Sequence, residues 1–564
     1  MNNEENYAAF RSGETVGSSA ENTPQDSKKG LFGVNDLTIR AIILAGLGSA
    51  LITASSMYVA LRLSALPWPT VFVAVLSMSI LKALGKTNLR EINMASTGMS
   101  AGAMVAGGLA FTIPGLFITG EWSTDASLVS HIPKLLFITF AGVILGLLLT
   151  YITRHRFVIR DRLPFPIGQA AARTLEAGDA GGLRSMYLYG AMTLSAIFTF
   201  LRDRLAVIPA AMTSASLYAK NIYMGIWLSP MAVGIGYTIG PLFTGIWFAG
   251  SIFAYGLLIP LGVSTGIFAD AAAAVSVKNS VGLGLMVGVG VGVLIDFMRS
   301  RIDHVKSEGG TKGVGGRLLG MLAVVIAYIF TLLADLNPIV AAAVIALTFL
   351  ASAMSGTITG QTGINPMEIF GIMTLLAVRV FANPGLVESF FITAVVAVAC
   401  GFAGDMLNDY KAGSELGTDP AGQLVTQAVG GLTGGFTAVF AMIAIISQYG
   451  GVGAEYGLSA GQAFAVTQMV GGIENPVIFF SALALSAVLY LMKFPVMTLG
   501  LGIYLSFEIS SIVFVGGFIR FIVDKVRKTP VDEGETGGLI AAGLLGGEGV
   551  TGVALAIIGM FTGG

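Results

Sequence analysis

The sequence predicts an all-α polytopic membrane protein, and three observations lead to that prediction. The 564 residues are 54% hydrophobic and only 11% charged, whereas soluble domains carry about 25% charged residues. Apolar runs of about 17–25 residues recur from residue 37 onward, and each is long enough to cross a hydrocarbon core of roughly 30 Å. These runs are continuous rather than alternating, which excludes a transmembrane β-barrel. At about 20 residues per span, the chain is expected to form about 16 transmembrane helices.

The distribution of basic residues predicts the orientation of the first spans, which cover residues 37–63, 67–84, 93–118 and 135–152. Lysine and arginine precede the first span and follow the second and the fourth, whereas the loop at 121–125 contains neither. Because cytoplasmic loops are enriched in these residues, the N-terminus is expected in the cytoplasm. Residues 1–34 have no apolar run and are expected to form a disordered cytoplasmic tail.

Short motifs that recur in the same order predict an internal duplication. The two copies lie 254 to 272 residues apart and have similar glycine and proline spacing. The matches are Glu91-Ile92-Asn93-Met94 with Gly363-Ile364-Asn365-Pro366, Pro166-Ile167-Gly168-Gln169 with Pro420-Ala421-Gly422-Gln423, Pro230–Tyr237 with Pro495–Tyr504, and Phe248–Gly250 with Phe514–Gly516. We therefore expect two pseudo-symmetric repeats in the membrane, at 35–300 and 317–564, joined by a basic cytoplasmic linker at 301–316. Two related halves with polar, interrupted helices are typical of secondary transporters.

The densest group of polar residues in the apolar part of the chain is at 404–415. Asp405 and Asp409 are four residues apart, so on a helix they share a face. Lys411 follows them and is a candidate to neutralise one of them. Ionisable groups inside a membrane cost about 2.5–3.5 kcal/mol each on insertion scales and therefore mark functional sites. The alternative interpretation is a cytoplasmic loop with solvated charges.

A second polar segment, at 357–368, interrupts an apolar span. It contains Gln361, Asn365 and Glu368, and Pro366 removes a backbone donor and disfavours helical dihedral angles at Asn365. A broken helix exposes backbone groups that can bind a polar solute at the midplane. The alternative interpretation is an ordinary turn between two helices.

Other polar residues complete the set of candidate site residues. About 14 residues from Pro164 to Ala177 are too short to span the membrane and suggest a re-entrant hairpin that carries Gln169; Gln423 is its counterpart in the second repeat. Glu176, Glu508 and Glu548 are isolated carboxylates in apolar surroundings. Desolvation favours the protonated form of such a group, so these three are candidates for proton coupling.

Several function classes are excluded by the residues that the chain lacks. Gly85-Lys86-Thr87 has Ile80 where a phosphate-binding loop needs its first glycine. The chain has three histidines and one cysteine, Cys400, which argues against a metal centre and disulfides. The net charge of −1 indicates no nucleic-acid partner. We therefore expect no enzymatic activity and no cofactor, and membrane lipid as the surroundings.

Together these segments resemble the oligopeptide transporter family, which includes the yellow-stripe-like metal-chelate carriers. The resemblance rests on Leu163-Pro164-Phe165-Pro166, Gly234–Pro241, Asn365-Pro366, Gly404–Gly413 and the glycine-rich stretch Gly537–Gly549. It implies a fold of 16 helices in two eight-helix halves and proton-coupled symport of peptides or metal–chelator complexes. The short loops and compact length are similar to the prokaryotic branch of the family, which implies a place in the cytoplasmic membrane.

The leading hypothesis is a proton-coupled importer of small oligopeptides. Its cargo is expected between the halves, bound by Gln169, Gln361, Asn365, Glu368, Asp405, Asp409, Lys411 and Gln423, with the proton carried by Glu176, Glu508 or Glu548. The alternative cargo is a metal–siderophore or metal–amino-acid chelate. A passive channel or structural membrane protein and an intramembrane aspartyl protease are further alternatives. A homodimer is compatible with the sequence, which identifies no interface.

Overall fold

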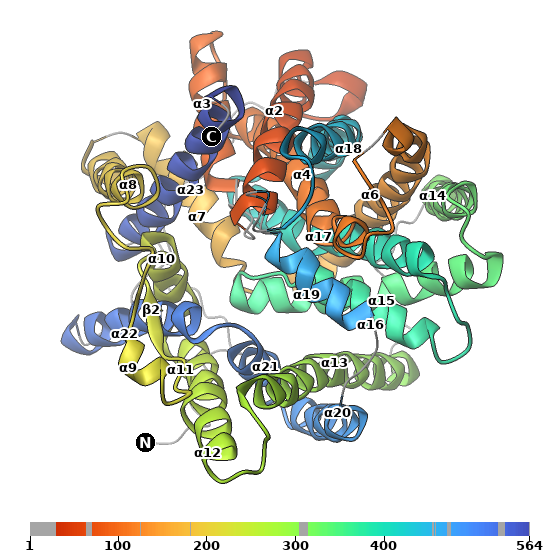
Figure 1. Ribbon diagram of the computed structural model, residues 1–564. Coiled ribbons are helices and arrows are strands. Elements are labelled where there is room, and N and C mark those ends of the chain that lie inside the picture. The colour runs from red at the N-terminus through yellow and green to blue at the C-terminus, as the bar shows by residue number, and fades with distance from the viewer. Residues whose placement is uncertain are drawn as a thin grey trace.

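The structure is a computed structural model, and it is helical almost throughout (Figure 1). It describes residues 30–63, 70–124, 126–180, 182–303, 314–453, 456, 458, 460–470, 475–527 and 536–562. Residues 1–29 of the expected tail and 304–313 of the expected linker lie outside these described residues. The one sheet in the described part is a short antiparallel pair, β1 (Ala211–Thr213) with β2 (Gly225–Trp227).

The helices of the N-terminal part follow the apolar runs. They are η1 (Leu31–Gly33), α2 (Ile39–Leu63), α3 (Thr70–Ala83), α4 (Leu89–Ala110), α5 (Gly115–Ile118), η2 (Ala126–His131), α6 (Ile132–Arg154), η3 (His155–Arg160), α7 (Pro166–Ala180), α8 (Gly182–Asp203), α9 (Ala215–Tyr218), α10 (Pro230–Ile239), α11 (Pro241–Ser251), η4 (Ile252–Leu258), α12 (Ile259–Ser264) and α13 (Ala271–Asp303). The four spans expected first correspond to α2, α3, α4 and α6.

The second part of the chain begins with another long apolar helix. Its elements are α14 (Val314–Leu333), α15 (Pro338–Thr362), α16 (Met367–Val378), α17 (Leu386–Leu416), α18 (Pro420–Tyr449), α19 (Gly461–Val470), α20 (Pro476–Leu491), α21 (Val496–Tyr504), α22 (Phe507–Arg527) and α23 (Thr536–Thr562). Within the described residues, eight helical stretches are long and apolar enough to span a membrane, and five shorter apolar helices accompany them. The chain is therefore a polytopic α-helical membrane protein.

Two groups of helices pack separately and meet along their sides. The first contains α2, α4, α6, α17 and α18, with α14 to α16 at its edge, and the second contains α10 to α13 and α20 to α22 (Figure 1). Helices α7, α8 and α23 connect the groups on one side, and α13 packs against α15 elsewhere. We call these the first and the second bundle.

Glycine lets helices in the first bundle approach closely. A methyl group at Gly98 of α4 would collide with the backbone of Thr426 in α18, and one at Gly430 of α18 would collide with the carbonyl of Gly98. One turn further on, Gly434 packs against Gly102. Lipid offers no hydrophobic drive for helix association, so small residues at the crossing stabilise it through close packing. This explains part of the high glycine content.

The packing around the second bundle is reciprocal. Helix α8 packs on α23 as α20 packs on α13, α10 packs on α22 as α21 packs on α11, and α10 packs on α23 as α21 packs on α13. Each contact has its counterpart when α8, α10, α11 and α13 are matched in order with α20, α21, α22 and α23. The rings of Phe248 and Phe514, matched by the sequence repeat, stack on each other at 4.5 Å between centroids.

The structure contradicts one local expectation and one alternative interpretation. The segment 164–177 is not a hairpin: Pro166 begins the single 15-residue helix α7, because a proline is tolerated in the first turn and alanines follow it. The residues 404–415 are not a solvated loop, because α17 continues through them to Leu416 and ends at Gly417, which has a φ of 69°. The sequence also suggests a shorter interruption at Gly472-Ile473-Glu474-Asn475-Pro476, most of which lies outside the described residues.

Candidate functional site

The polar C-terminal half of α17 is buried inside the first bundle. Asp405 is 3% exposed and Asp409 is 1% exposed, although both are carboxylic acids in a helix that is apolar before them. The same helix face carries both side chains, as the four-residue spacing predicts. Burying carboxyl groups in a membrane protein is costly, so their position requires polar partners or a functional reason.

Asp405 meets the broken helix that the sequence predicts. Helix α15 ends at Thr362, Gly363 adopts a left-handed conformation with a φ of 73°, and α16 begins at Met367. Between them, Asn365 donates through Nδ2 to Asp405 Oδ2 at 2.9 Å and to the carbonyl of Cys400 at 2.9 Å. Oδ1 of Asp405 is buried and accepts no hydrogen bond from the described residues. One oxygen of this carboxyl group is therefore satisfied and the other is available.

Glycine makes this contact possible. A methyl group at Gly404 would collide with Asn365 Nδ2 and with the hydroxyls of Ser355 and Thr359. Ser355 Oγ in turn donates to Asn365 Oδ1 at 3.0 Å, which fixes the orientation of the amide. The helix break between α15 and α16 is thus stabilised by its contacts with α17.

Asp409 belongs to a second polar network, between α4, α17 and α18. Ser100 Oγ donates to Asp409 Oδ2 at 2.6 Å. Gln423 Nε2 donates to the Asp409 carbonyl at 2.8 Å and to Asn93 Oδ1 and Thr97 Oγ1, each at 3.1 Å. Gln423 and Asp409, both candidate site residues from the sequence, are therefore in direct contact.

Gln169 lies on α7, which packs against α17. The preceding residue, Gly168, donates its backbone N–H to Asn408 Oδ1 at 3.1 Å and touches the Asn408 backbone. Gln169 is buried, and its Oε1 accepts from Arg173 at 3.3 Å. The two copies of the Pro-x-Gly-Gln motif thus both begin helices that pack near α17.

Glu368 adds a third buried carboxyl group. It is 7% exposed in the first turn of α16, and its charge acts on Asp405. Within the described residues, no salt bridge joins Glu368, Asp405 or Asp409 to a basic side chain. We call Asn365, Glu368, Asp405 and Asp409 the carboxyl cluster, because three of its four members are acids.

Lys411 lies apart from the carboxyl cluster. Its Nζ forms a salt bridge with Glu415 Oε1 at 3.3 Å on the same helix. The idea that Lys411 neutralises one of the aspartates was therefore wrong, because its side chain leaves the buried face and points along α17 to a partly exposed glutamate.

Glu176, Glu508 and Glu548 occupy three different environments. Glu176 is exposed on α7, which differs from the apolar surroundings that the sequence suggests. Glu508 is partly buried at the start of α22 and accepts from Tyr218 Oη at 2.6 Å. This hydrogen bond to the carboxylate raises the pKa of Tyr218, which lies outside the membrane spans, to about 12.

Glu548 is buried but paired with a cation. Its Oε1 is 2.9 Å from Arg202 Nη2, and its Oε2 accepts from Ser229 Oγ and from the Met231 N–H, each at 2.8 Å. The expectation of an isolated carboxylate in apolar surroundings was wrong. A charged arginine on α8 compensates the buried charge on α23 and ties both helices to the start of α10.

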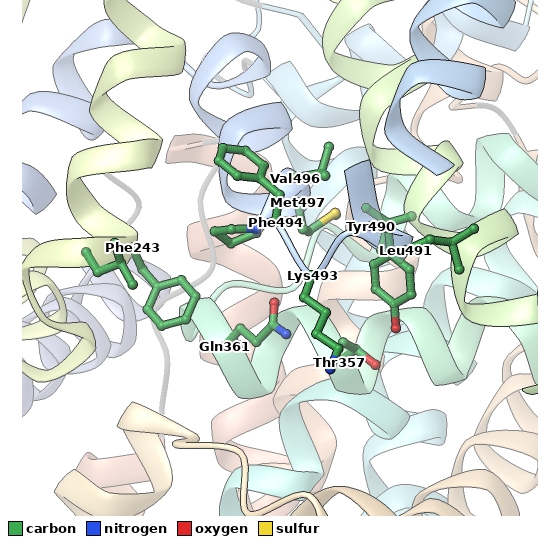
Figure 2. Close-up of a pocket in the computed structure, with 12 residues that line it drawn as sticks. Phe243, Thr357, Gln361, Tyr490, Leu491, Lys493, Phe494, Val496 and Met497 are labelled. Carbon is green, nitrogen blue, oxygen red and sulfur yellow. The ribbon is translucent and has the colours of Figure 1, made fainter. Parts of the chain in front are cut away.

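Gln361 lines a pocket between the two bundles (Figure 2). The pocket has a volume of about 360 Å³ and is lined by Leu242, Phe243, Val289, Thr357, Gln361, Tyr490, Leu491, Lys493, Phe494, Pro495, Val496 and Met497. This volume is at the lower end of the range for small-molecule sites, about 300–1,000 Å³. Thr357 and Gln361 come from the end of α15, one turn before the helix break.

Three functional candidates escaped the sequence reasoning. Lys278 is buried in α13, and it is the one charged residue in the apolar stretch Ala271–Val289, a signal that was present in the sequence. Gln427 is fully buried one turn after Gln423, and neither polar atom of its side chain has a partner among the described residues. Arg202 was missed because it belongs to the charged run Arg202-Asp203-Arg204, and nothing in that run points to Glu548, 346 residues away.

The chemistry of the site is that of polar solute binding. No group of three or more histidine, cysteine, aspartate or glutamate side chains in the described residues is arranged to hold a metal ion. Carboxyl groups and an interrupted helix inside a bundle of membrane helices mark a pathway for a solute or proton. The fold and the site together define a polytopic membrane transporter.

Comparison with known proteins gives the family. The family model of the OPT oligopeptide transporter protein matches residues 36–307 and 314–558. This chain belongs to the OPT oligopeptide transporter family, whose members are transporters and not enzymes. A protein of Haemophilus influenzae, whose name assigns it provisionally to oligopeptide transport, is 27% identical over 594 aligned positions, which cover 89% of this chain and 92% of that protein. The resemblance stated from the sequence is confirmed.

Proposed function

We propose that this protein imports small oligopeptides across the cytoplasmic membrane of a prokaryote by proton-coupled symport, with its N-terminus in the cytoplasm. The observation that carries the proposal is the carboxyl cluster: three buried acids, without a salt bridge to a basic side chain in the described residues, beside a broken helix. Buried acids of this kind form proton relays in pumps and transporters. They also suit the positively charged amino group of a peptide.

The proposed architecture is two pseudo-symmetric halves of about eight helices each. The reciprocal packing of α8, α10, α11 and α13 with α20 to α23 supports it, as does the stacking of the matched rings Phe248 and Phe514. Related halves around a site near the midplane allow alternating access by rocking one bundle against the other. A homodimer remains a prediction, which the mass of the purified protein in detergent would test.

We propose a cargo site between the bundles, from the carboxyl cluster to the pocket that Gln361 lines. Asn365, Glu368, Asp405 and Asp409 would bind the amino end of the peptide, and Gln361 would donate to its backbone. Gln169 and Gln423 support α17 at the level of Asn408 and Asp409. Lys411, already paired with Glu415, would contact cargo only during release.

Purified protein in liposomes tests this proposal. Labelled trialanine should accumulate when an inward proton gradient is imposed, and not without it. Asp405→Asn, Asp409→Asn and Glu368→Gln preserve side-chain size. At least one of them should abolish accumulation while exchange of labelled for unlabelled peptide at equal concentrations continues, because exchange needs cargo binding but no net proton movement. The matched control is Glu415→Gln, an acid on α17 that lies outside the carboxyl cluster, which should accumulate peptide normally.

Each alternative gives a different result. Accumulation that is unaffected by all three substitutions would refute the role of the carboxyl cluster. Failure of the folded wild-type protein to take up trialanine, together with uptake of an iron–citrate or copper–histidine complex, would reassign the cargo to metal chelates. Uptake that never exceeds the outside concentration under a gradient would indicate a passive pathway.

A further inference from the structure

Lys278 is a buried cation that the proposed mechanism has not used. It lies in the first third of α13 and is 3% exposed. Every other residue of the apolar stretch Ala271–Val289 is uncharged. A lysine in this position is costly unless an anion or polar groups compensate it.

The immediate partners of Lys278 are neutral. Its Nζ donates to Tyr255 Oη at 3.0 Å and to the carbonyl of Tyr504 at 2.8 Å. The same ammonium lies 4.8 Å from the ring centroid of Tyr255 and 5.8 Å from that of Tyr504. An ammonium has three N–H donors, and no salt bridge in the described part of the chain involves this one. Two aromatic rings and two neutral oxygens therefore surround the ammonium of Lys278. One of its three N–H donors is left to bind an anion.

The two tyrosines around Lys278 lie within electrostatic range of carboxylates from both bundles, Glu508 on α22 for Tyr255 and Glu368 on α16 for Tyr504. Among the described residues, neither acid forms a salt bridge with Lys278. Tyr504 therefore contacts Lys278 directly and lies within electrostatic range of one member of the carboxyl cluster. This is the charge arrangement of a zwitterion-binding site.

We propose that Lys278 binds the C-terminal carboxylate of the cargo peptide, while the carboxyl cluster binds its amino end. This inference rests on the proposed function as a peptide carrier, and it replaces Lys411 with Lys278 as the positive group of the site. The carboxylate takes the remaining N–H of the ammonium, and the Tyr255 hydroxyl is placed to donate a second hydrogen bond. A charge-assisted pair inside the membrane is stronger than an equivalent pair in water.

The test compares trialanine with its C-terminal amide, which differ only in the carboxylate, and neither has an acidic side chain. Wild-type protein in liposomes should take up the acid at least about 10-fold better than the amide. A hydrogen bond to a charged group changes binding affinity by about 10- to 100-fold. Lys278→Gln should reduce uptake of the acid by about 10- to 100-fold and make acid and amide equal. Lys278→Arg keeps the charge and should retain part of the preference. The control Lys86→Gln, an exposed lysine outside the proposed cargo site, should keep the wild-type preference.

The outcomes separate this inference from the proposed function. Equal uptake of acid and amide by the wild-type protein would overturn the role of Lys278 and leave peptide transport intact. No uptake of either peptide by the folded wild-type protein would overturn both proposals. A Lys278→Gln protein that loses uptake of both peptides equally would assign Lys278 to the transport cycle and not to the carboxylate. If Lys278→Gln does not elute as a single species, thermal stabilisation of the wild-type protein by the acid and not by the amide decides the question.

Discussion

The buried ion pair between Arg202 and Glu548 allows a prediction that separates structural from transport roles. The side chains are 5% and 6% exposed, and Nη2 and Oε1 are 2.9 Å apart. Removing one member of a buried pair costs about 3–5 kcal/mol, because the other charge is left without compensation. We therefore predict that Glu548 stabilises the contact between α8, α10 and α23, and that it does not carry the transported proton.

The structure predicts unequal effects for the two single substitutions. Arg202→Met leaves Glu548 with only the Ser229 hydroxyl and the Met231 N–H as donors, so the full cost of about 3–5 kcal/mol applies. Glu548→Gln leaves Arg202 in its two-bond contact with Asp203, at 2.6 and 2.8 Å. The cost there is that of weakened hydrogen bonds, about 1–3 kcal/mol. In the double variant Arg202→Met/Glu548→Leu no buried charge is left unpaired, so it should be more stable than Arg202→Met alone.

Size-exclusion chromatography after stepwise heating of detergent-solubilised protein ranks these variants. The expected order of stability is wild type, Glu548→Gln, the double variant, and Arg202→Met, with the middle two close together. Glu548→Gln that survives purification should still accumulate trialanine under a proton gradient. A double variant less stable than both single variants would refute the reasoning. It would show that the losses from Arg202 and Glu548 add up, with no interaction energy between the two side chains. Loss of accumulation in stable Glu548→Gln would return Glu548 to the proton pathway.

Two further predictions follow from the contacts between helices. Gly236→Ala should prevent α10 from packing on α22 and yield aggregated protein, since the added methyl group would collide with the carbonyl of Val513, whereas Gly245→Ala on α11, with no neighbouring atom within 4 Å, should elute like the wild type. For the Tyr218–Glu508 hydrogen bond, the raised pKa of Tyr218 means that its stabilisation is complete below about pH 10 and is lost as the pH rises through about 12. The ultraviolet difference titration between wild type and Tyr218→Phe should therefore have a midpoint near 12, and Glu508→Gln should move it toward about 10; a midpoint already near 10 in the wild type would contradict the bond.

Much of the fold could be predicted because its causes are local in the chain. Apolar runs and proline positions gave the helices from α2 to α6 and the break after Gly363, since both depend on neighbouring residues. The same local reasoning brought Asn365, Asp405 and Gln423 into the candidate site. It failed at 164–177, which was expected to form a hairpin because it is too short to span the membrane. The alanines that follow Pro166 favour one continuous helix instead.

Partners between distant segments could not be predicted from the sequence. Glu548 was expected in apolar surroundings because its own segment is apolar, yet Arg202 arrives from another helix and pairs with it. Lys411 was expected beside the aspartates because it is close in the chain, yet it points along α17 to Glu415. Gln427 gained its significance only from burial, which depends on the helices that cover it. Lys278 is visible in the sequence as a lone charge in an apolar stretch, but its partners are not.

The sequence by itself determined that this protein is a helical membrane transporter of the OPT family, because hydropathy, charge distribution and motif order are properties of the chain. Only the tertiary structure decided which polar residues face one another. Asp405 meets Asn365 because Gly404 leaves room for the amide, and Lys278 meets Tyr255 and Tyr504 because α13 packs against η4 and α21. Electrostatic interactions depend on distance in space and on solvent exposure, and the order of residues along a chain specifies neither.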